Sequence, residues 1–202
     1  VTRFAEAHRE VAAAAGEPSN LRGFPASTAA AIAGLCERAG PGEGAGGDIT
    51  AIYSVLVAGS DMEEPVADIL RGVLDGHVVL DRAIAERGRY PAVDIVRSVS
   101  RSLPDVASVA ENDLIIRARR HLGVYARAEL MIQSGLYVPG SDPEIDTAIA
   151  CHEALDHFVT CPSPDGPGQA FQALRRALQP DSDEGVQNAP PGFATAQEDS
   201  PD

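Results

Sequence analysis

The sequence contains no lysine, because all 16 of its basic residues are arginine. Within these residues a Schiff-base lysine, a catalytic ammonium group and the lysine of a phosphate-binding loop are therefore excluded. The 30 acidic residues bring the formal net charge to −14, which argues against a nucleic-acid or anionic-membrane partner, since both require a basic surface. The apolar fraction of 44% and the length of 202 residues predict a globular chain of one large or two small domains.

Cysteine is also scarce: the sequence has three, an odd number, which does not suit a framework of paired disulfides. Cys36, Cys151 and Cys161 are most simply explained by a reducing cytoplasm. We find no charged-then-apolar leader, and no apolar run reaches the roughly 20 residues of a membrane span. Helical spacing begins at Phe4, close behind Val1, as though the chain were cut in at a helix.

Residues 179–202 differ in composition from the rest of the chain. They carry six acidic residues and four prolines, and they contain no basic residue. Low hydrophobicity combined with charge of one sign is typical of disorder. We therefore predict a disordered acidic tail that holds no site.

Residues 1–104 alternate between helix and strand patterns. The predicted helices are 2–15, 27–38, 65–74 and 83–87, and the predicted strands are 49–57 and 77–80. The strand at 49–57 is apolar on both alternating faces, which favours the centre of a covered sheet. Alternation of this kind predicts an α/β layered domain.

After residue 104 only helical patterns remain, at 105–134, 143–160 and 168–178. An apolar stripe lies opposite arginines on the first of these helices: Leu114, Ile115, Ala118, His121, Leu122 and Tyr125. The predicted fold class is therefore α/β followed by an all-helical domain that ends near residue 178.

Two stretches that look like ligand sites fail on their context. The glycine-rich stretch 40–47 joins a helix to a strand, whereas a phosphate-binding loop joins a strand to a helix, so we predict a plain linker. Of the Cys and His residues between 151 and 161, only His157 and Cys161 share a helical face, and no metal site is predicted. A general-base role for His77 competes with local packing and hydrogen bonding, the commoner fate of such a histidine.

The segment from Gly88 to Arg101 is predicted to be a long loop that ends in Ser-Val-Ser-Arg. A guanidinium between small serines can reach another subunit and stabilise charge on a transferring phosphoryl group. Tyr90, held by Pro91, offers a flat face on which a base can stack. These two side chains are the candidates that the residues themselves suggest.

Six motifs follow one another in order along the chain. They are GDITAIYSVLV at 47–57, DMEEPVAD at 61–68, LDGHVVL at 74–80, AERGRYPAVD at 85–94, SVSR at 98–101 and GSDP at 140–143. The series resembles flagellar protein-export ATPases and their type III secretion relatives, which are in turn similar to the catalytic subunit of the F-type ATP synthase. The resemblance runs from Thr2 to about Leu178.

This resemblance implies that residues 1–104 are the back half of a RecA-like nucleotide-binding domain and residues 105–178 a helical C-terminal domain. ATP with Mg is the implied cofactor. The phosphate loop with its lysine, the catalytic glutamate and the Mg-associated aspartate are expected upstream of Val1. The chain alone is therefore expected not to hydrolyse ATP.

The resemblance also implies roles for single residues. Arg101 matches the arginine finger that reaches the γ-phosphate of the neighbouring subunit. Tyr90 matches the aromatic residue that stacks on adenine in its own subunit, and Phe158 matches a second adenine-side aromatic. Arg89 is a departure, because relatives often carry histidine there. The loop facing the central stalk protein matches Leu136, Tyr137, Gly140, Ser141, Asp142 and Pro143.

The implied assembly is a homohexamer that hydrolyses ATP to energise protein export. Its implied partners are the central stalk, regulatory subunits, and export substrates with their chaperones. It is expected in the cytoplasm, peripheral at the inner face of the membrane export gate. Two alternatives are the catalytic subunit of a rotary ATP synthase and a non-catalytic ring or adaptor protein of the same fold. The GSDP motif at 140–143 favours the export branch, because the synthase carries an acidic stretch there.

Overall fold

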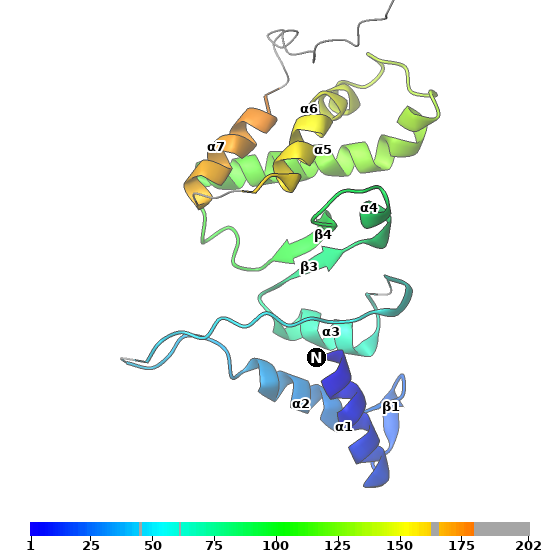
Figure 1. Ribbon diagram of the computed structural model, residues 1–202, viewed down its shortest axis with the longest axis vertical. Helices are drawn as coiled ribbons and strands as arrows, with labels where there is room; N and C mark the ends of the chain where they lie inside the picture. The colour runs from blue at the N-terminus through cyan, green and yellow to red at the C-terminus, as the bar shows by residue number, and fades with distance from the viewer. Residues whose placement is uncertain (45, 61, 163–165, 180–202) are drawn as a thin grey trace, which may run out of the picture. The chain divides into compact units, whose positions relative to one another are not determined.

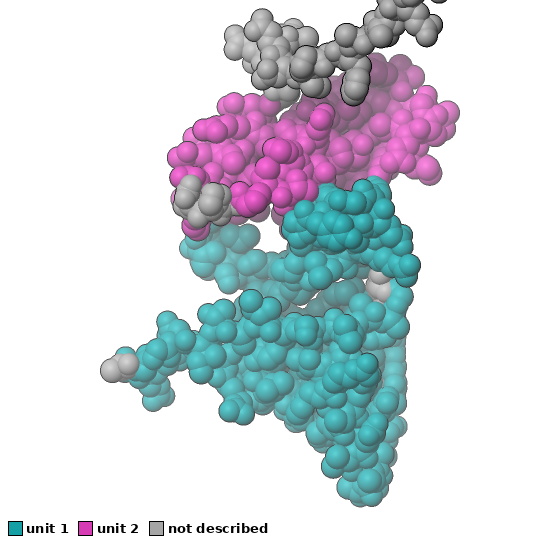
Figure 2. Space-filling view, viewed as in Figure 1, with its two compact units in different colours: residues 1–107 teal, residues 108–202 magenta. Residues whose placement is uncertain are grey.

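The structure, a computed structural model, describes residues 1–44, 46–60, 62–162 and 166–179 (Figure 1). The chain divides into two compact units, Val1–Ala107 and a second that begins at Ser108 (Figure 2). The first unit combines helices with strands and the second is helical, which confirms the predicted fold class. The predicted acidic tail lies outside the described residues, except for Gln179.

Three helices build the core of the first unit: α1 (Thr2–Ala14), α2 (Ala26–Cys36) and α3 (Pro65–Val73). They confirm the helices predicted at 2–15, 27–38 and 65–74. Pro65 stands in the first turn of α3, where its missing N–H costs nothing. The buried side chains that the three helices share are Ala5, Ile32, Cys36, Val66 and Leu70.

Two antiparallel strand pairs complete this unit. β1 (Ser19–Leu21) and β2 (Phe24–Pro25) form a short hairpin. β3 (Gly76–Leu80) pairs with β4 (Val93–Ser100), and α4 (Arg82–Glu86) lies between them in the sequence. The Asp81 carboxylate caps α4 by accepting a hydrogen bond from Ala83 N at 2.8 Å.

The strand predicted at 49–57 is wrong. Among the described residues this segment forms only one isolated bridge, between Gly40 and Ile49, and Ile52 is 96% exposed. It is held instead by side chains: Tyr53 Oη donates to Leu35 O at 3.2 Å, and Leu56 N donates to Thr2 Oγ1 at 2.9 Å. A β-branched run favours extended backbone, but a strand also needs a neighbour to share its hydrogen bonds. A one-turn 3-10 helix, η1 (Ala58–Ser60), follows.

The loop predicted from Gly88 to Arg101 is also wrong over most of its length. Its second part is β4, which pairs with the earlier strand β3 so that His77 lies opposite Val99 and Leu80 lies opposite Val93. The strand was missed because Gly88 and Pro91 are turn signals, and both precede the paired residues.

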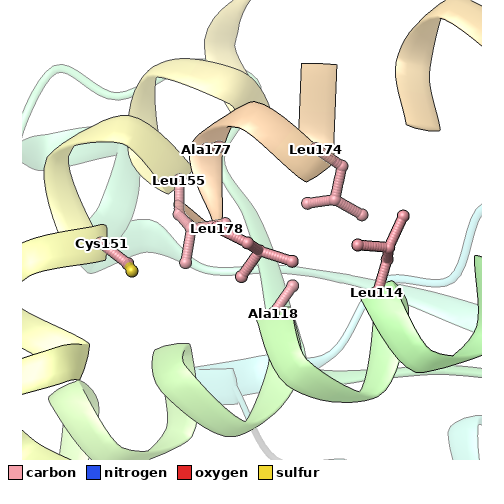
Figure 3. Close-up of a cluster of buried hydrophobic side chains, with 7 residues drawn as sticks. All are labelled: Leu114, Ala118, Cys151, Leu155, Leu174, Ala177 and Leu178. Carbon is pink, nitrogen blue, oxygen red and sulfur yellow. The ribbon is translucent and has the colours of Figure 1, made fainter. Parts of the chain in front are cut away.

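The second unit consists of α5 (Val109–Gln133), α6 (Pro143–Thr160) and α7 (Pro167–Ala177). These confirm the three predicted helices. The first starts a few residues late because Ser108 and Glu111 form a capping box. A cluster of buried side chains joins all three helices (Figure 3): Leu114, Ala118, Cys151, Leu155, Leu174, Ala177 and Leu178. None of the helices in the described part of the chain is long and apolar enough to span a bilayer.

Candidate functional site

Arg101 lies directly after β4, at the end where this strand pairs with the start of β3. Its main-chain N–H donates to Asp75 O at 2.7 Å, and the preceding residue, Ser100, is in register with Gly76. A Cβ atom on Gly76 would come within 2.5 Å of Val99 O. Only glycine allows this approach, so Gly76 fixes where the strand ends and where Arg101 begins.

The Arg101 guanidinium binds the C-terminal end of α3. One nitrogen donates to Arg71 O at 2.7 Å and another to Gly72 O at 3.3 Å. The last carbonyls of a helix have no partner within the helix and carry the negative end of its dipole, so a cation is favoured there. The predicted candidate is therefore an exposed arginine at a strand end, held by its own chain, rather than a side chain projecting from a loop.

An open depression of about 450 Å³ surrounds this guanidinium. Its polar side chains come from α3, from the start of β3 and from the residue after β4: Asp68, Arg71, His77 and Arg101. The two guanidinium groups of Arg71 and Arg101 outnumber the single carboxylate of Asp68, so the depression suits an anionic group.

Tyr90 lies in the turn between α4 and β4, with its side chain 65% exposed and its peptide bond to Pro91 cis. The turn is fixed by Val93 N, which donates to Pro91 O at 2.8 Å, and by the Arg89 guanidinium, which donates to Val93 O at 2.8 Å. An exposed ring on a fixed turn can stack on a flat ligand. The eight residues of β4 span roughly 26 Å, so the structure does not bring Tyr90 and Arg101 together.

Phe158 lies on α6 in the second unit, where its half-buried ring packs against the shared core cluster. Tyr90 belongs to the first unit, so neither unit alone brings the two rings together. The ring of Phe158 thus has a packing role of its own, and its role beside adenine stays a prediction.

The α5–α6 loop, residues 134–142, contains most of the residues predicted to face a stalk. Gly140 adopts a φ of 86°, which favours glycine. The Asp142 carboxylate accepts from Glu144 N at 2.8 Å and so caps α6, with Pro143 in its first turn. Leu136 and Val138 are 75% and 68% exposed. The loop is therefore an ordered turn that carries apolar side chains on its outer side.

Two polar residues that organise these sites were not among the predicted candidates. Ser98 fills the irregularity between β3 and β4, because its hydroxyl accepts from Val79 N at 3.0 Å and donates to Asp94 O at 2.6 Å. Asp146 reaches back from α6 to the loop, where its carboxylate accepts from Tyr137 Oη at 2.9 Å. The only sequence signal for Asp146 is its spacing of four from Asp142, which places both on one helical face.

The histidines and cysteines form no metal site in the described part of the chain, where no group of three or more ligating side chains occurs. His77 Nε2 lies 3.2 Å from Arg97 O, in agreement with the local role. His157 Nε2 lies 3.2 Å from Cys161 Sγ, the pair predicted to share a face.

Burial shifts several pKa values in the second unit and around α2. It raises the pKa of the Cys36 and Cys151 thiols, so both stay protonated. The pKa of His121 is lowered first by burial and then by the neighbouring charges of Arg117 and Arg120, while Glu144 acts in the opposite direction. Its Nδ1 is buried without a hydrogen-bond partner among the described residues, so His121 is neutral near pH 7.

Two family models match the chain, one in each unit. Residues 1–100 match the nucleotide-binding domain of the ATP synthase alpha/beta family, and residues 108–162 match the C-terminal domain of the type III secretion ATPase EscN. The chain therefore belongs to the ATP synthase alpha/beta family. Its second unit places it in the branch of the type III secretion ATPases, which confirms the resemblance inferred from the motifs.

Individual relatives support the same branch. The flagellum-specific ATP synthase of Caulobacter vibrioides is 44% identical over 165 residues, which cover 79% of this chain and 37% of the relative. The assembled ATPase EscN of the enteropathogenic E. coli type III secretion system has a TM-score of 0.81 at 36% identity, covering 89% of this chain and 43% of that one. EscN in complex with its central stalk EscO matches with a TM-score of 0.74 at 36% identity, covering 89% and 42%. The chain thus spans less than half the length of each of these three relatives.

Proposed function

We propose that this chain is part of a ring-shaped ATPase that energises protein export through a flagellar or type III secretion apparatus. The observation that carries the proposal is the position of Arg101: an exposed guanidinium, fixed at a strand end beside a depression that suits an anion. Similarity to a flagellum-specific ATP synthase and to EscN supports the export role. The match of residues 108–162 to the EscN C-terminal domain favours export over a rotary synthase.

In this proposal Arg101 acts on the nucleotide of the neighbouring subunit. ATP with Mg, when bound, supplies the phosphoryl group that is transferred, and its phosphate-binding and Mg-binding residues lie outside this chain. Arg101 leaves Arg71 O and Gly72 O and donates to phosphate oxygens, where its charge stabilises the transition state. An arginine supplied in this way contributes roughly 10³ to 10⁵ in kcat in other phosphoryl-transfer enzymes.

Tyr90 serves the nucleotide site of its own subunit by stacking on adenine. The roughly 26 Å length of β4 supports two different sites, because one nucleotide cannot contact residues at both ends of this strand through its base and its γ-phosphate. Phe158 is the proposed second aromatic beside adenine. Phe158 is only partly buried by the core cluster, and this assignment requires that its remaining exposed part faces the nucleotide.

The α5–α6 loop is the proposed contact with a central stalk. The complex of EscN with its central stalk EscO supports such a partner, and the exposed Leu136 and Val138 provide an apolar surface for it. The remaining proposed partners are five further copies of the protein, regulatory subunits, and export substrates with their chaperones. The proposed location is the cytoplasmic face of the membrane export gate.

The test is Arg101→Ala in the full-length protein, with ATP turnover and nucleotide affinity measured side by side. Turnover is expected to fall roughly 10³- to 10⁵-fold while nucleotide affinity stays near that of the wild type. Arg101→Lys is also expected to be slow, because an ammonium cannot donate from a planar fork.

Arg97→Ala is the matched control. Arg97 lies on the same strand and its guanidinium is engaged with Asp81 at 3.4 Å, away from the proposed phosphate contact. Turnover in Arg101→Ala within tenfold of the wild type contradicts the arginine-finger role. A full-length wild-type protein that binds but does not hydrolyse ATP favours the non-catalytic ring protein instead.

A further inference from the structure

Among the described residues, all side-chain hydrogen bonds of Asp146 go to the α5–α6 loop. Its Oδ1 accepts from Tyr137 Oη at 2.9 Å and from Gly140 N at 3.2 Å, and its Oδ2 accepts from Gly140 N at 3.0 Å. One carboxylate therefore ties together the first and the second half of the loop. Hydrogen bonds to an ionised acceptor are about twice as strong as those between neutral groups.

Helix capping does not explain this arrangement. The N-cap of α6 is Asp142, whose carboxylate already accepts from Glu144 N at 2.8 Å and Ile145 N at 3.4 Å. The main-chain N–H of Asp146 makes the regular helical bond to Asp142 O at 3.0 Å. Two aspartates one turn apart thus have different roles: the Asp142 carboxylate caps the N-terminus of α6, and the Asp146 carboxylate binds the loop.

The direction of the side chains in the loop depends on this contact. Tyr137 is half-buried and points inward, with its hydroxyl 3.0 Å from Asp142 O as well as 2.9 Å from Asp146 Oδ1. Its two apolar neighbours, Leu136 and Val138, point outward and are 75% and 68% exposed. Leu136 and Val138 are the direct chain neighbours of Tyr137, so anchoring the Tyr137 ring restricts the directions that both can take.

We infer that Asp146 is a positioning residue, which holds the α5–α6 loop in the conformation that presents Leu136 and Val138 to an apolar face of the central stalk. This inference rests on the stalk-contacting role proposed above for the loop. Two further exposed apolar side chains lie on the last turn of α5, close to the loop in sequence: Leu130 is 80% exposed and Met131 is 44% exposed. An ordered loop that displays apolar side chains loses little conformational entropy on binding, which is the physical benefit of preorganisation.

The matched control is Glu144, also an acidic residue in the first turn of α6. Its carboxylate accepts from Arg120 Nε of α5 at 2.6 Å, and no bond from this carboxylate to the loop is found among the described residues. Asp146→Asn and Glu144→Gln remove one negative charge each from the same end of the same helix. A change in loop exchange or stalk binding that appears in Asp146→Asn and not in Glu144→Gln therefore does not arise from the helix dipole.

The experiment measures two quantities in the full-length protein. Amide hydrogen exchange reports the order of residues 137–141, and surface plasmon resonance reports the affinity for the central stalk subunit cloned from the same organism. Asp146→Asn is expected to raise exchange at Gly140 and Ser141 roughly fivefold or more. It is expected to weaken stalk binding roughly three- to tenfold. Glu144→Gln is expected to change neither quantity.

Tyr137→Phe removes only a hydroxyl and keeps the ring, so it tests the same contact without a change of charge. The double variant Tyr137→Phe with Asp146→Asn should show a smaller effect than the sum of the two single effects. The reason is that both substitutions remove the same hydrogen bond, from Tyr137 Oη to Asp146 Oδ1. Additive effects, or unchanged loop exchange in Asp146→Asn, overturn the positioning role.

Leu136→Ala distinguishes a failure of the positioning role of Asp146 from a failure of the proposed contact between the loop and the stalk. If Leu136→Ala weakens stalk binding but Asp146→Asn does not, the loop contacts the stalk and the role of Asp146 is overturned. If neither variant weakens stalk binding, the stalk-contacting role of the loop fails and the inference fails with it, whatever the exchange data show.

Discussion

Gly76→Ala is expected to destabilise the first unit and to displace Arg101. The new Cβ would lie 2.5 Å from Val99 O and 3.2 Å from Ser100 Cα, and both are main-chain atoms that cannot rotate away. β4 must therefore shift at the end that leads into Arg101. Overpacking of this kind costs roughly 1–3 kcal/mol. For a unit of this size, each kcal/mol lowers Tm by roughly 4–8 °C.

Gly72→Ala is the matched control because its Cβ meets no atom within 4 Å, and Gly72 lies in the last turn of α3. Alanine at a helical position is expected to leave stability unchanged or to raise it by about 0.5–1 kcal/mol. Urea unfolding followed by far-UV circular dichroism measures both variants. Equal midpoints for Gly76→Ala and Gly72→Ala would refute the argument that strand approach requires glycine at position 76.

Two further predictions concern the second unit and the thiols. Because the pKa of His121 is lowered in the folded protein, the unfolded chain binds more protons, and stability should fall as the pH drops below about 6.5. His121→Gln should remove that part of the pH dependence in urea unfolding at pH 7.5, 6.5 and 5.5, and an unaltered slope contradicts the assignment. Iodoacetamide should alkylate the exposed Cys161 in the native protein and spare the buried Cys36 and Cys151 until urea is added, as peptide mass spectrometry can check.

Local patterns predicted the helices well, because helices are held by bonds between near neighbours. The helix at 143–160 follows from an aspartate followed by proline and from regular apolar spacing, and it begins and ends as predicted. The strands fared worse. The run at 49–57 has strand composition and no strand partner among the described residues. In contrast, β4 pairs with β3, but the turn signals just before β4 favour a loop in the sequence-based prediction.

The candidate sites show the same division. Arg101 and Tyr90 are candidates because their residue types and sequence neighbours suggest their chemistry, and their roles stay predictions. The acceptors of the Arg101 guanidinium lie 29 and 30 residues earlier in the sequence, and no local pattern points to them. Asp146 was missed for a related reason: an aspartate in the first turn of a helix is expected for its charge alone, which hides its bonds to the loop.

The contact between Arg101 and the end of α3 links two equilibria. The guanidinium satisfies Arg71 O and Gly72 O only while it is not bound elsewhere, so an anion that captures it leaves those carbonyls to solvent and loosens the last turn of α3. Linkage is reciprocal: a change that loosens this turn makes Arg101 easier to capture by the same factor. The end of one short helix therefore sets part of the affinity with which an anionic ligand can recruit this arginine.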